Sequence, residues 1–295
     1  MPEKEKTDEQ TIIKREYKDR LFKLIFGREE YKEATLDLYN AITGSNFTDT
    51  EELKINTIED AVYCSMHNDV SFIIAETINL FEHQSSYSPN IPMRMLLYVS
   101  KLYSKMLDAN PLMKKKMYTH SQVVFPTPKF YVFFNGPENE PEQTILEISK
   151  NFKDGNNSDL QLKATMYNIN YGKNRELKSN CSALSDYSKA VHNMAEYKSS
   201  GMEADEAVAK AIEALPDGLV KRILIAHRAE ATEMFLTEYD EELTHQGFYE
   251  DGYENGRNDV KAETAKAMLA KGLDEALISE CTSLPIEEVR KFKEN

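Results

Sequence analysis

Two acidic residues and one amide, Asp69, Glu82 and Gln84, have the side-chain types that hold a hard divalent cation and orient a water molecule beside it. Asp69 directly precedes residues 70–74, a run of apolar and β-branched side chains that predicts a strand. Glu82 and Gln84 lie two positions apart at the end of a second such run, residues 78–84. Because successive side chains of a strand point to opposite faces, Glu82 and Gln84 share one face of the expected sheet.

Whether Asp69 joins them depends on how the two strands are connected. With Glu76 and Thr77 at the tip of an antiparallel hairpin, Asp69 lies opposite Gln84 and diagonal to Glu82, with about 7–8 Å between their backbones. A loop one residue longer or shorter would move Asp69 to the other face and remove the site. The tip contains no Asn-Gly or Asp-Gly pair, so this loop length is a hypothesis.

Two carboxylates on one face predict a site for Mg²⁺ or Mn²⁺, since both ions prefer oxygen ligands. An ion bound by Asp69 and Glu82 would make a water molecule nucleophilic and neutralise the charge that develops during phosphodiester hydrolysis. Gln84 could orient that water, but it is uncharged and cannot lower the pKa of the water as a lysine would. Alternatively, Asp69 and Glu82 are exposed strand charges and Gln84 is a polar filler, because so short a pattern also occurs by chance.

Two neighbouring residues have side chains that could take part in the same chemistry. His83 should point to the opposite, packed face of the sheet, which favours a hydrogen-bonded core histidine over a general base. Arg94 falls in the first turn of a helix expected from Met93, where it could bind a phosphate together with the backbone N–H groups. An ion pair with a nearby acid is the alternative for Arg94.

The charge distribution bears on the kind of ligand. The net charge is −14, but residues 201–295 contain 11 Lys and Arg against 22 Asp and Glu, which accounts for most of it. Residues 93–131 contain seven basic residues against Asp108 alone. Lys114, Lys115 and Lys116 in this segment predict a patch that faces phosphates. A solvated helix face with a basic turn is the alternative.

The elements that must position these residues follow an α/β order. Helical periodicity at 15–40 is followed by strand-like runs, a helix from Met93, further strand-like runs, and an almost entirely helical remainder. The strand-like runs are 55–63, 70–74, 78–84, 130–134, 144–149 and 160–169. We therefore expect a mixed β-sheet flanked by helices, with a helical C-terminal region.

This order divides the chain into four expected parts: an N-terminal tail (1–14), the α/β core (15–200), a helical extension (201–246) and a helical C-terminal tail (247–295). The tail resembles a short helix-turn-helix, which could place its last helix in the major groove of DNA. Glu287 and Glu288 open that helix and would repel phosphates, which favours an interaction role or homo-oligomerisation through these helices.

Several classes of protein are disfavoured by the sequence. No apolar run approaches the roughly 20 residues of a membrane-spanning helix, and the first twenty residues lack the apolar region of a secretory signal. Three cysteines without a Cys-x-x-Cys pair suit a reducing compartment and predict a cytoplasmic protein. Neither a Gly-rich phosphate loop nor a Ser-His-Asp arrangement stands out.

Over most of its length the chain also resembles a known family. The run NDVSFII…NLFEHQSSYSPNIPMRMLLYVSKLY resembles the core of the Rpn-type recombination-promoting nucleases, also described as PD-(D/E)XK nuclease family transposases. The similarity covers roughly residues 15–260. Further segments that match are DRLFKLIFG (Asp19 to Gly27), FPTPKFYVFFNG (Phe125 to Gly136), TMYNIN (Thr165 to Asn170) and LTEYDEE (Leu236 to Glu242).

The resemblance implies a restriction-endonuclease-like core and a role for individual residues. Asp69 and Glu82 correspond to the metal ligands, and Gln84 stands where the motif has a lysine. Asp19 is a candidate accessory acid, or else a solvent-facing helix charge. The implied activity is that of a Mg²⁺-dependent (or Mn²⁺-dependent) DNA endonuclease linked to recombination or mobile elements. The alternatives are a nuclease-like binding module with little or no cleavage and, less favoured, an RNase.

Overall fold

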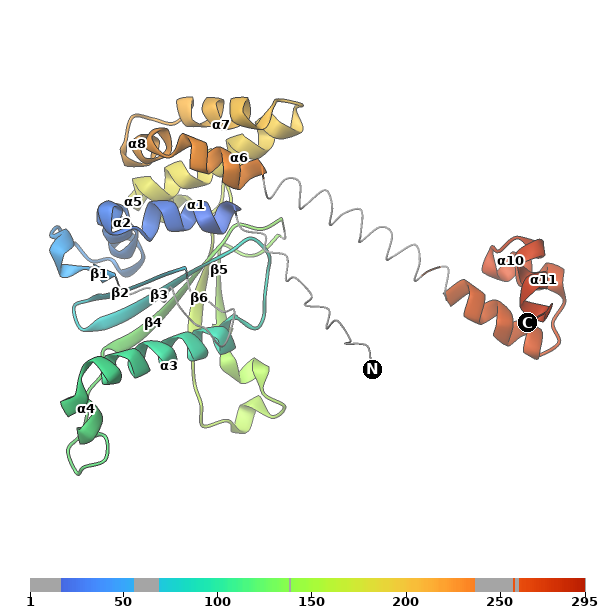
Figure 1. Cartoon of the computed structure of the whole chain (residues 1–295), viewed down its shortest axis with the longest axis horizontal. Coiled ribbons are helices and arrows are strands. Elements are labelled where there is room, and N and C mark those ends of the chain that lie inside the picture. Colours follow the sequence, from blue (N-terminus) through green and yellow to red (C-terminus); the bar gives the residue numbers. More distant parts are fainter. Residues whose placement is uncertain (1–16, 56–68, 138, 237–256, 258–259, 295) are drawn as a thin grey trace, which may run out of the picture. The chain divides into compact units, whose positions relative to one another are not determined.

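The computed structural model describes residues 17–55, 69–137, 139–236, 257 and 260–294 (Figure 1). The chain divides into two compact units, Met1–Glu238 and Tyr239–Asn295, which are described separately. No helix within the described ranges is long and apolar enough to cross a membrane.

The first unit is built on a six-stranded mixed sheet with strand order β1-β2-β3-β4-β6-β5. The strands β1, β2 and β3 are antiparallel neighbours, β3, β4 and β6 run parallel, and β5 pairs antiparallel with β6 at the edge. Their bounds are Lys54–Ile55 (β1), Val70–Ile74 (β2), Thr77–Gln84 (β3), Thr127–Phe134 (β4), Gln143–Glu147 (β5) and Lys163–Asn168 (β6). The expected α/β class with a mixed sheet is confirmed. Of the strand expected at 55–63, only Ile55 lies within the described residues.

Helices lie over both faces of this sheet, with α3 and the short α4 that follows it on one side and α1, α2 and α5 to α8 on the other (Figure 1). The helices are α1 (Tyr17–Phe26), α2 (Lys32–Thr43), α3 (Ile91–Ala109), α4 (Pro111–Lys116), α5 (Arg175–Asn180), α6 (Ser182–Ser199), α7 (Ala204–Glu213) and α8 (Leu219–Ala226). Because α7 and α8 pack against α6, the helices of the expected 201–246 extension belong to the same unit as the sheet.

The central strand β3 is buried along almost its whole length because it has neighbours on both sides and helices over both faces. Ile78 and Leu80 pack in the apolar cluster beneath α3, whereas Phe81 packs in the cluster beneath α1 and α6. A strand in this position normally consists of apolar residues. The buried polar side chains Glu82 and His83 are therefore exceptions that require partners.

The hairpin between β2 and β3 corrects one expectation from the sequence. Ala75 (φ 45°) and Glu76 (φ 62°) form its two-residue turn, and Ile74 pairs with Thr77. Two consecutive positive φ values are those of a type I′ turn, whose twist matches the flanking strands even without the usual Asn-Gly pair. The tip is thus one residue earlier than predicted and the register shifts by two. An even shift keeps every side chain on its predicted face.

The second unit is a small helical body. Residues 260–270 are helical and are followed by α10 (Glu275–Thr282) and α11 (Ile286–Glu294). The Asp274 side chain accepts hydrogen bonds from the first N–H groups of α10, as an N-cap does. Ala265, Ile278, Leu284 and Val289 form its buried apolar cluster.

Candidate active site

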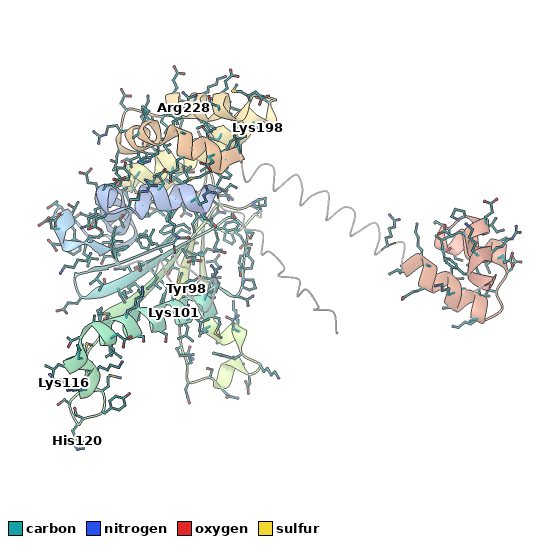
Figure 2. The ribbon with its side chains drawn as sticks, in the orientation of Figure 1. Tyr98, Lys101, Lys116, His120, Lys198 and Arg228 are labelled. Carbon is teal, nitrogen blue, oxygen red and sulfur yellow. The ribbon has the colours of Figure 1, made fainter. Side chains whose placement is uncertain are left out.

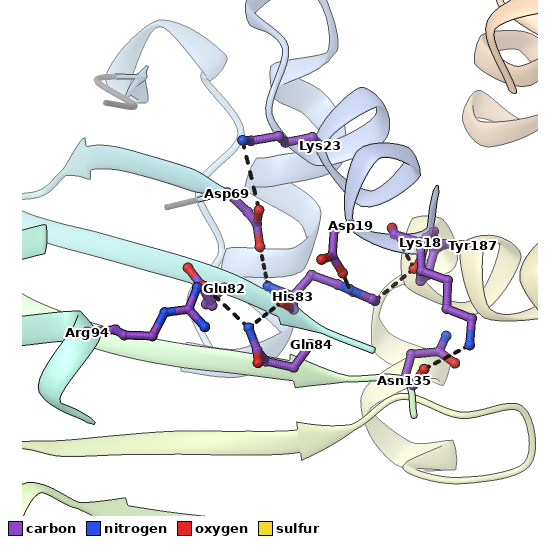
Figure 3. Close-up of polar contacts among 10 residues, drawn as sticks. All are labelled: Lys18, Asp19, Lys23, Asp69, Glu82, His83, Gln84, Arg94, Asn135 and Tyr187. Carbon is purple, nitrogen blue, oxygen red and sulfur yellow. Dashed lines mark hydrogen bonds and ion pairs between the residues drawn. The ribbon is translucent and has the colours of Figure 1, made fainter. Parts of the chain in front are cut away.

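The β2–β3 hairpin brings Asp69 and Glu82 together. Its last ladder pair is Val70 with Phe81, so continuing the register by one residue places Asp69 directly opposite Glu82. The predicted diagonal placement, with Asp69 opposite Gln84, is therefore wrong by two residues, because the turn is tighter than assumed. Directly opposite residues have Cβ atoms roughly 4.5–5.5 Å apart, closer than a diagonal pair. Figure 3 shows both side chains at this end of the hairpin.

Asp69 is held by one hydrogen bond and one long ion pair. Its Oδ2 accepts a hydrogen bond from the backbone N–H of His83 at 2.6 Å, and its Oδ1 lies 3.9 Å from Nζ of Lys23. Burial, and after it the negative charge of Asp19, raises the pKa of Asp69 to about 7 from its ordinary 3.8. The charge of Lys23 and the His83 hydrogen bond act in the opposite direction without cancelling the shift.

Glu82 lies deeper, with only 2% of its surface exposed. Its Oε1 forms an ion pair with the Arg94 guanidinium and accepts a hydrogen bond from Nε2 of Gln84 at 3.3 Å. Its Oε2 is buried and has no hydrogen-bond partner among the described residues. Burial and the neighbouring Asp69 raise the pKa of Glu82 well above its usual range, and Arg94 opposes the shift. The surroundings thus disfavour the ionised forms of both carboxyl groups.

The guanidinium of Arg94 forms an ion pair with the Glu82 carboxylate. Its Nε and Nη2 also donate to the Tyr98 hydroxyl, at 3.2 and 3.0 Å, which fixes the guanidinium beside Glu82. Of the two roles considered for Arg94, the structure shows the ion pair. A third of the Arg94 side chain remains exposed.

Gln84 lies two residues after Glu82 on β3 and shares its face of the sheet. Its Nε2 donates to the His83 carbonyl at 2.8 Å as well as to Glu82. With the amide nitrogen used in this way, the side-chain carbonyl oxygen remains as the group that could accept a hydrogen bond from a water molecule.

His83 is a satisfied core histidine, as expected. It is fully buried, its Nδ1 hydrogen-bonds with Asp19 and its Nε2 lies 2.9 Å from the Tyr187 hydroxyl. Burial lowers the pKa of His83 to about 3, so the ring is neutral at physiological pH. The Tyr187 hydroxyl also donates to the Lys18 carbonyl at 3.1 Å, so it bridges His83 and α1. The links of His83 to α1 and α6 tie the site strand to the helices over the opposite face.

The hydrogen bond between His83 and Asp19 shows on which face of the sheet Asp19 lies. Its carboxylate hydrogen-bonds with the His83 ring, on the sheet face opposite that of Glu82 (Figure 3). Asp19 still raises the pKa values of both site carboxylates through its charge. In the parts of the chain that the structure describes, no three Asp, Glu, His or Cys side chains are grouped so that they could hold a metal ion. The structure thus gives a pair of carboxylates without Asp19 as a third ligand.

The pair nevertheless has the donor chemistry that Mg²⁺ requires. The Oε2 of Glu82 is a buried carboxyl oxygen without a hydrogen-bond partner among the described residues, and Asp69, directly before β2, supplies a second carboxyl group. Both carboxyl groups have raised pKa values because burial and like charge disfavour their ionised forms. A divalent cation between them would remove this penalty. Mg²⁺ is commonly held by two carboxylates, with water and substrate oxygens completing its shell.

The three lysines predicted to bind phosphate lie elsewhere. Lys114, Lys115 and Lys116 form the last turn of α4, beyond the C-terminal end of α3, whereas Arg94 lies in the first turn of α3. At 1.5 Å per residue, the 15 residues from Arg94 to Ala109 span about 23 Å. The tertiary structure therefore separates the lysines from the two carboxylates.

Three site residues were missed by the sequence reasoning, and helical spacing could have indicated two of them. Lys23 is four residues after Asp19 on α1, and Tyr98 is four residues after Arg94 on α3, so each pair shares one helix face. Tyr187 contacts His83 from α6, 104 positions along the chain. No local signal could have indicated that contact.

Comparisons with protein-family models, with curated proteins and with solved structures give no match to this chain.

Proposed function

We propose that this chain is a Mg²⁺-dependent (or Mn²⁺-dependent) DNA endonuclease with a PD-(D/E)XK-type, restriction-endonuclease-like core, similar to the Rpn-type recombination-promoting nucleases. The observation that carries the proposal is the pair of Asp69 and Glu82, whose carboxyl groups both have raised pKa values, with one oxygen of Glu82 buried without a hydrogen-bond partner among the described residues. Support for the fold comes from the mixed sheet with helices on both faces. The Cys usage favours a cytoplasmic location, and the C-terminal helices are candidates for homo-oligomerisation.

Each residue has a distinct part in this proposal. Asp69 and Glu82 would hold the ion, which when bound would supply a Lewis acid and an acidified water. Gln84 would orient the attacking water through its side-chain carbonyl. Arg94 balances one oxygen of Glu82, and its exposed edge lies where it could contact a substrate phosphate. The hydrogen bond from His83 N–H to Asp69 fixes the carboxylate opposite Glu82.

A binding module with little or no cleavage is the second candidate. One observation favours it: the Arg94 guanidinium already neutralises part of the charge of Glu82. In such a protein the nuclease-like fold would bind DNA or a partner without hydrolysing a phosphodiester bond.

Supercoiled plasmid separates the two candidates. The purified chain is incubated with plasmid in EDTA, Mg²⁺ or Mn²⁺, beside Asp69→Ala and Glu82→Gln. Glu206→Gln on the exposed surface of α7 is the matched control. Metal-dependent nicking that both site variants lose and the control retains supports the endonuclease. The same behaviour of wild type and both site variants under every metal condition would support the binding module. A parallel reaction with single-stranded RNA tests the RNase alternative.

A further inference from the structure

Helices α3 and α4 form an arm that leads away from the candidate active site. Residues 94–118 run from Arg94 beside Glu82, along α3, to α4 and the turn that follows it. Figure 2 shows Lys116 and His120 at the far end of this arm, on the side of the sheet away from Lys198 and Arg228. This segment is called the α3–α4 arm below.

Basic side chains continue along one face of the arm. Arg94, Lys101 and Lys105 are spaced by seven and four residues, which places them in one row along α3. The Nζ of Lys101 is shielded from solvent and has no hydrogen-bond partner among the described residues. The row of basic residues thus starts at the proposed cleavage site and continues along α3.

The end of the arm combines cations with an exposed ring. Lys115 and Lys116 are exposed, as is Lys114, which forms an ion pair with Asp108 at 2.7 Å. Asp108 is the sole acidic residue between positions 93 and 131. Beside the lysines, Tyr118 is 89% exposed, although a side chain of this size is usually at least half covered.

We propose that the α3–α4 arm binds the phosphate backbone of duplex DNA on one side of the cleavage position. This inference rests on the proposed function, because the row of cations is continuous with Arg94 at the candidate active site. The arm is about 23 Å long from Arg94 to the end of α3, and the phosphates of one strand advance by about 3.4 Å per base pair. The end of α3 would therefore lie about seven base pairs from the scissile phosphate, and the lysines of α4 would contact the backbone beyond that point.

The proposal is tested by the salt dependence of binding. Anisotropy of a labelled duplex of about 30 base pairs is measured in EDTA, which excludes cleavage, for the wild type and for Lys115→Glu/Lys116→Glu. The matched control, Lys210→Glu/Arg222→Glu, makes the same charge change on exposed positions of α7 and α8, across the sheet. The arm variant should bind at least about tenfold more weakly at low salt, and the slope of log K against log salt should fall by about two. The control should bind as the wild type does.

Two results would overturn the arm proposal. The first is that the wild-type chain does not bind duplex DNA, or that it binds no more tightly than the arm variant. For this comparison, circular dichroism must show that the arm variant keeps its helices. The other is binding of phosphatidylserine vesicles that depends on Lys115 and Lys116 while duplex binding does not, which would make the arm a membrane contact. Binding is measured without metal, so lysine-dependent binding supports the arm even where plasmid nicking fails. If the wild type nicks plasmid and the arm variant binds duplex DNA as tightly as the wild type, the arm proposal fails and the proposed function stands.

Discussion

Replacing Asp69 with Asn should stabilise the metal-free protein and abolish its response to Mg²⁺. At neutral pH an ionised Asp69 is unfavourable in the folded chain, because burial and neighbouring acid raise its pKa to about 7 from 3.8. A raised folded-state pKa of an acid means that its contribution to stability is greatest below about pH 4 and is lost as the pH rises through 7. Asparagine has nearly the same shape and no charge, so the variant should not lose stability as the pH rises through 7.

The size of the effect follows from the contacts of the carboxylate. A shift of about three pKa units corresponds to about 4 kcal/mol at 1.36 kcal/mol per unit. This net shift already includes the Lys23 charge and the His83 hydrogen bond, since both lower the pKa of Asp69. Asparagine resembles the protonated carboxyl group in shape and charge. The gain in the free energy of unfolding should therefore be at most about 4 kcal/mol at about pH 7.5 and should vanish toward pH 4.

Urea unfolding followed by far-UV circular dichroism measures this effect, since the chain contains no tryptophan for fluorescence. Mg²⁺ at about 100 times its Kd should stabilise the wild type by about 2.7 kcal/mol and leave Asp69→Asn unchanged. Asp159→Asn, an exposed substitution of the same type, is the control. A variant that is less stable than the wild type at about pH 7.5, or that responds equally to Mg²⁺, would refute the assignment of Asp69 as a strained metal ligand.

Three further outcomes are expected. Arg94→Met should lower the free energy of unfolding of the metal-free protein by about 1–3 kcal/mol in urea titrations, because it leaves the buried Glu82 carboxylate without its ion-pair partner. Mg²⁺ should restore much of that loss. An unchanged free energy of unfolding would show that the ion pair is dispensable. Ala75→Asn with Glu76→Gly should raise the free energy of unfolding by about 1 kcal/mol, because these residues adopt positive φ more readily at the type I′ turn; a loss would contradict the turn assignment. Burial lowers the pKa of Lys178 to about 8 from 10.5, so the unfolded chain binds more protons between these values and stability should rise with pH there. Urea titrations at about pH 7.5 and 9.5 measure this increase in the free energy of unfolding, which should be smaller in Lys178→Met than in the wild type. Equal increases in the two proteins would exclude the effect.

The sequence alone determined the local elements of this protein. Alternation and β-branched content predicted the strand at 70–74, and the apolar face after Met93 predicted α3, because both signals repeat within a few residues. The strand period placed Glu82 and Gln84 on one face of β3, although the tip of the hairpin was predicted one residue too late. The α/β order with a mixed sheet followed from the sequence of these elements.

Only the tertiary structure decided which charged and polar side chains contact one another. The pairing of Glu82 with Arg94, the contact between Asp19 and His83 across 64 positions, and the hydrogen bond from Tyr187 depend on how distant elements pack. The separation of the α4 lysines from the carboxylates depends on the length and direction of α3. Sequence periodicity reports only which face of an element is buried. The partner of a buried charge is set by the three-dimensional packing of helices and strands that are far apart in the chain.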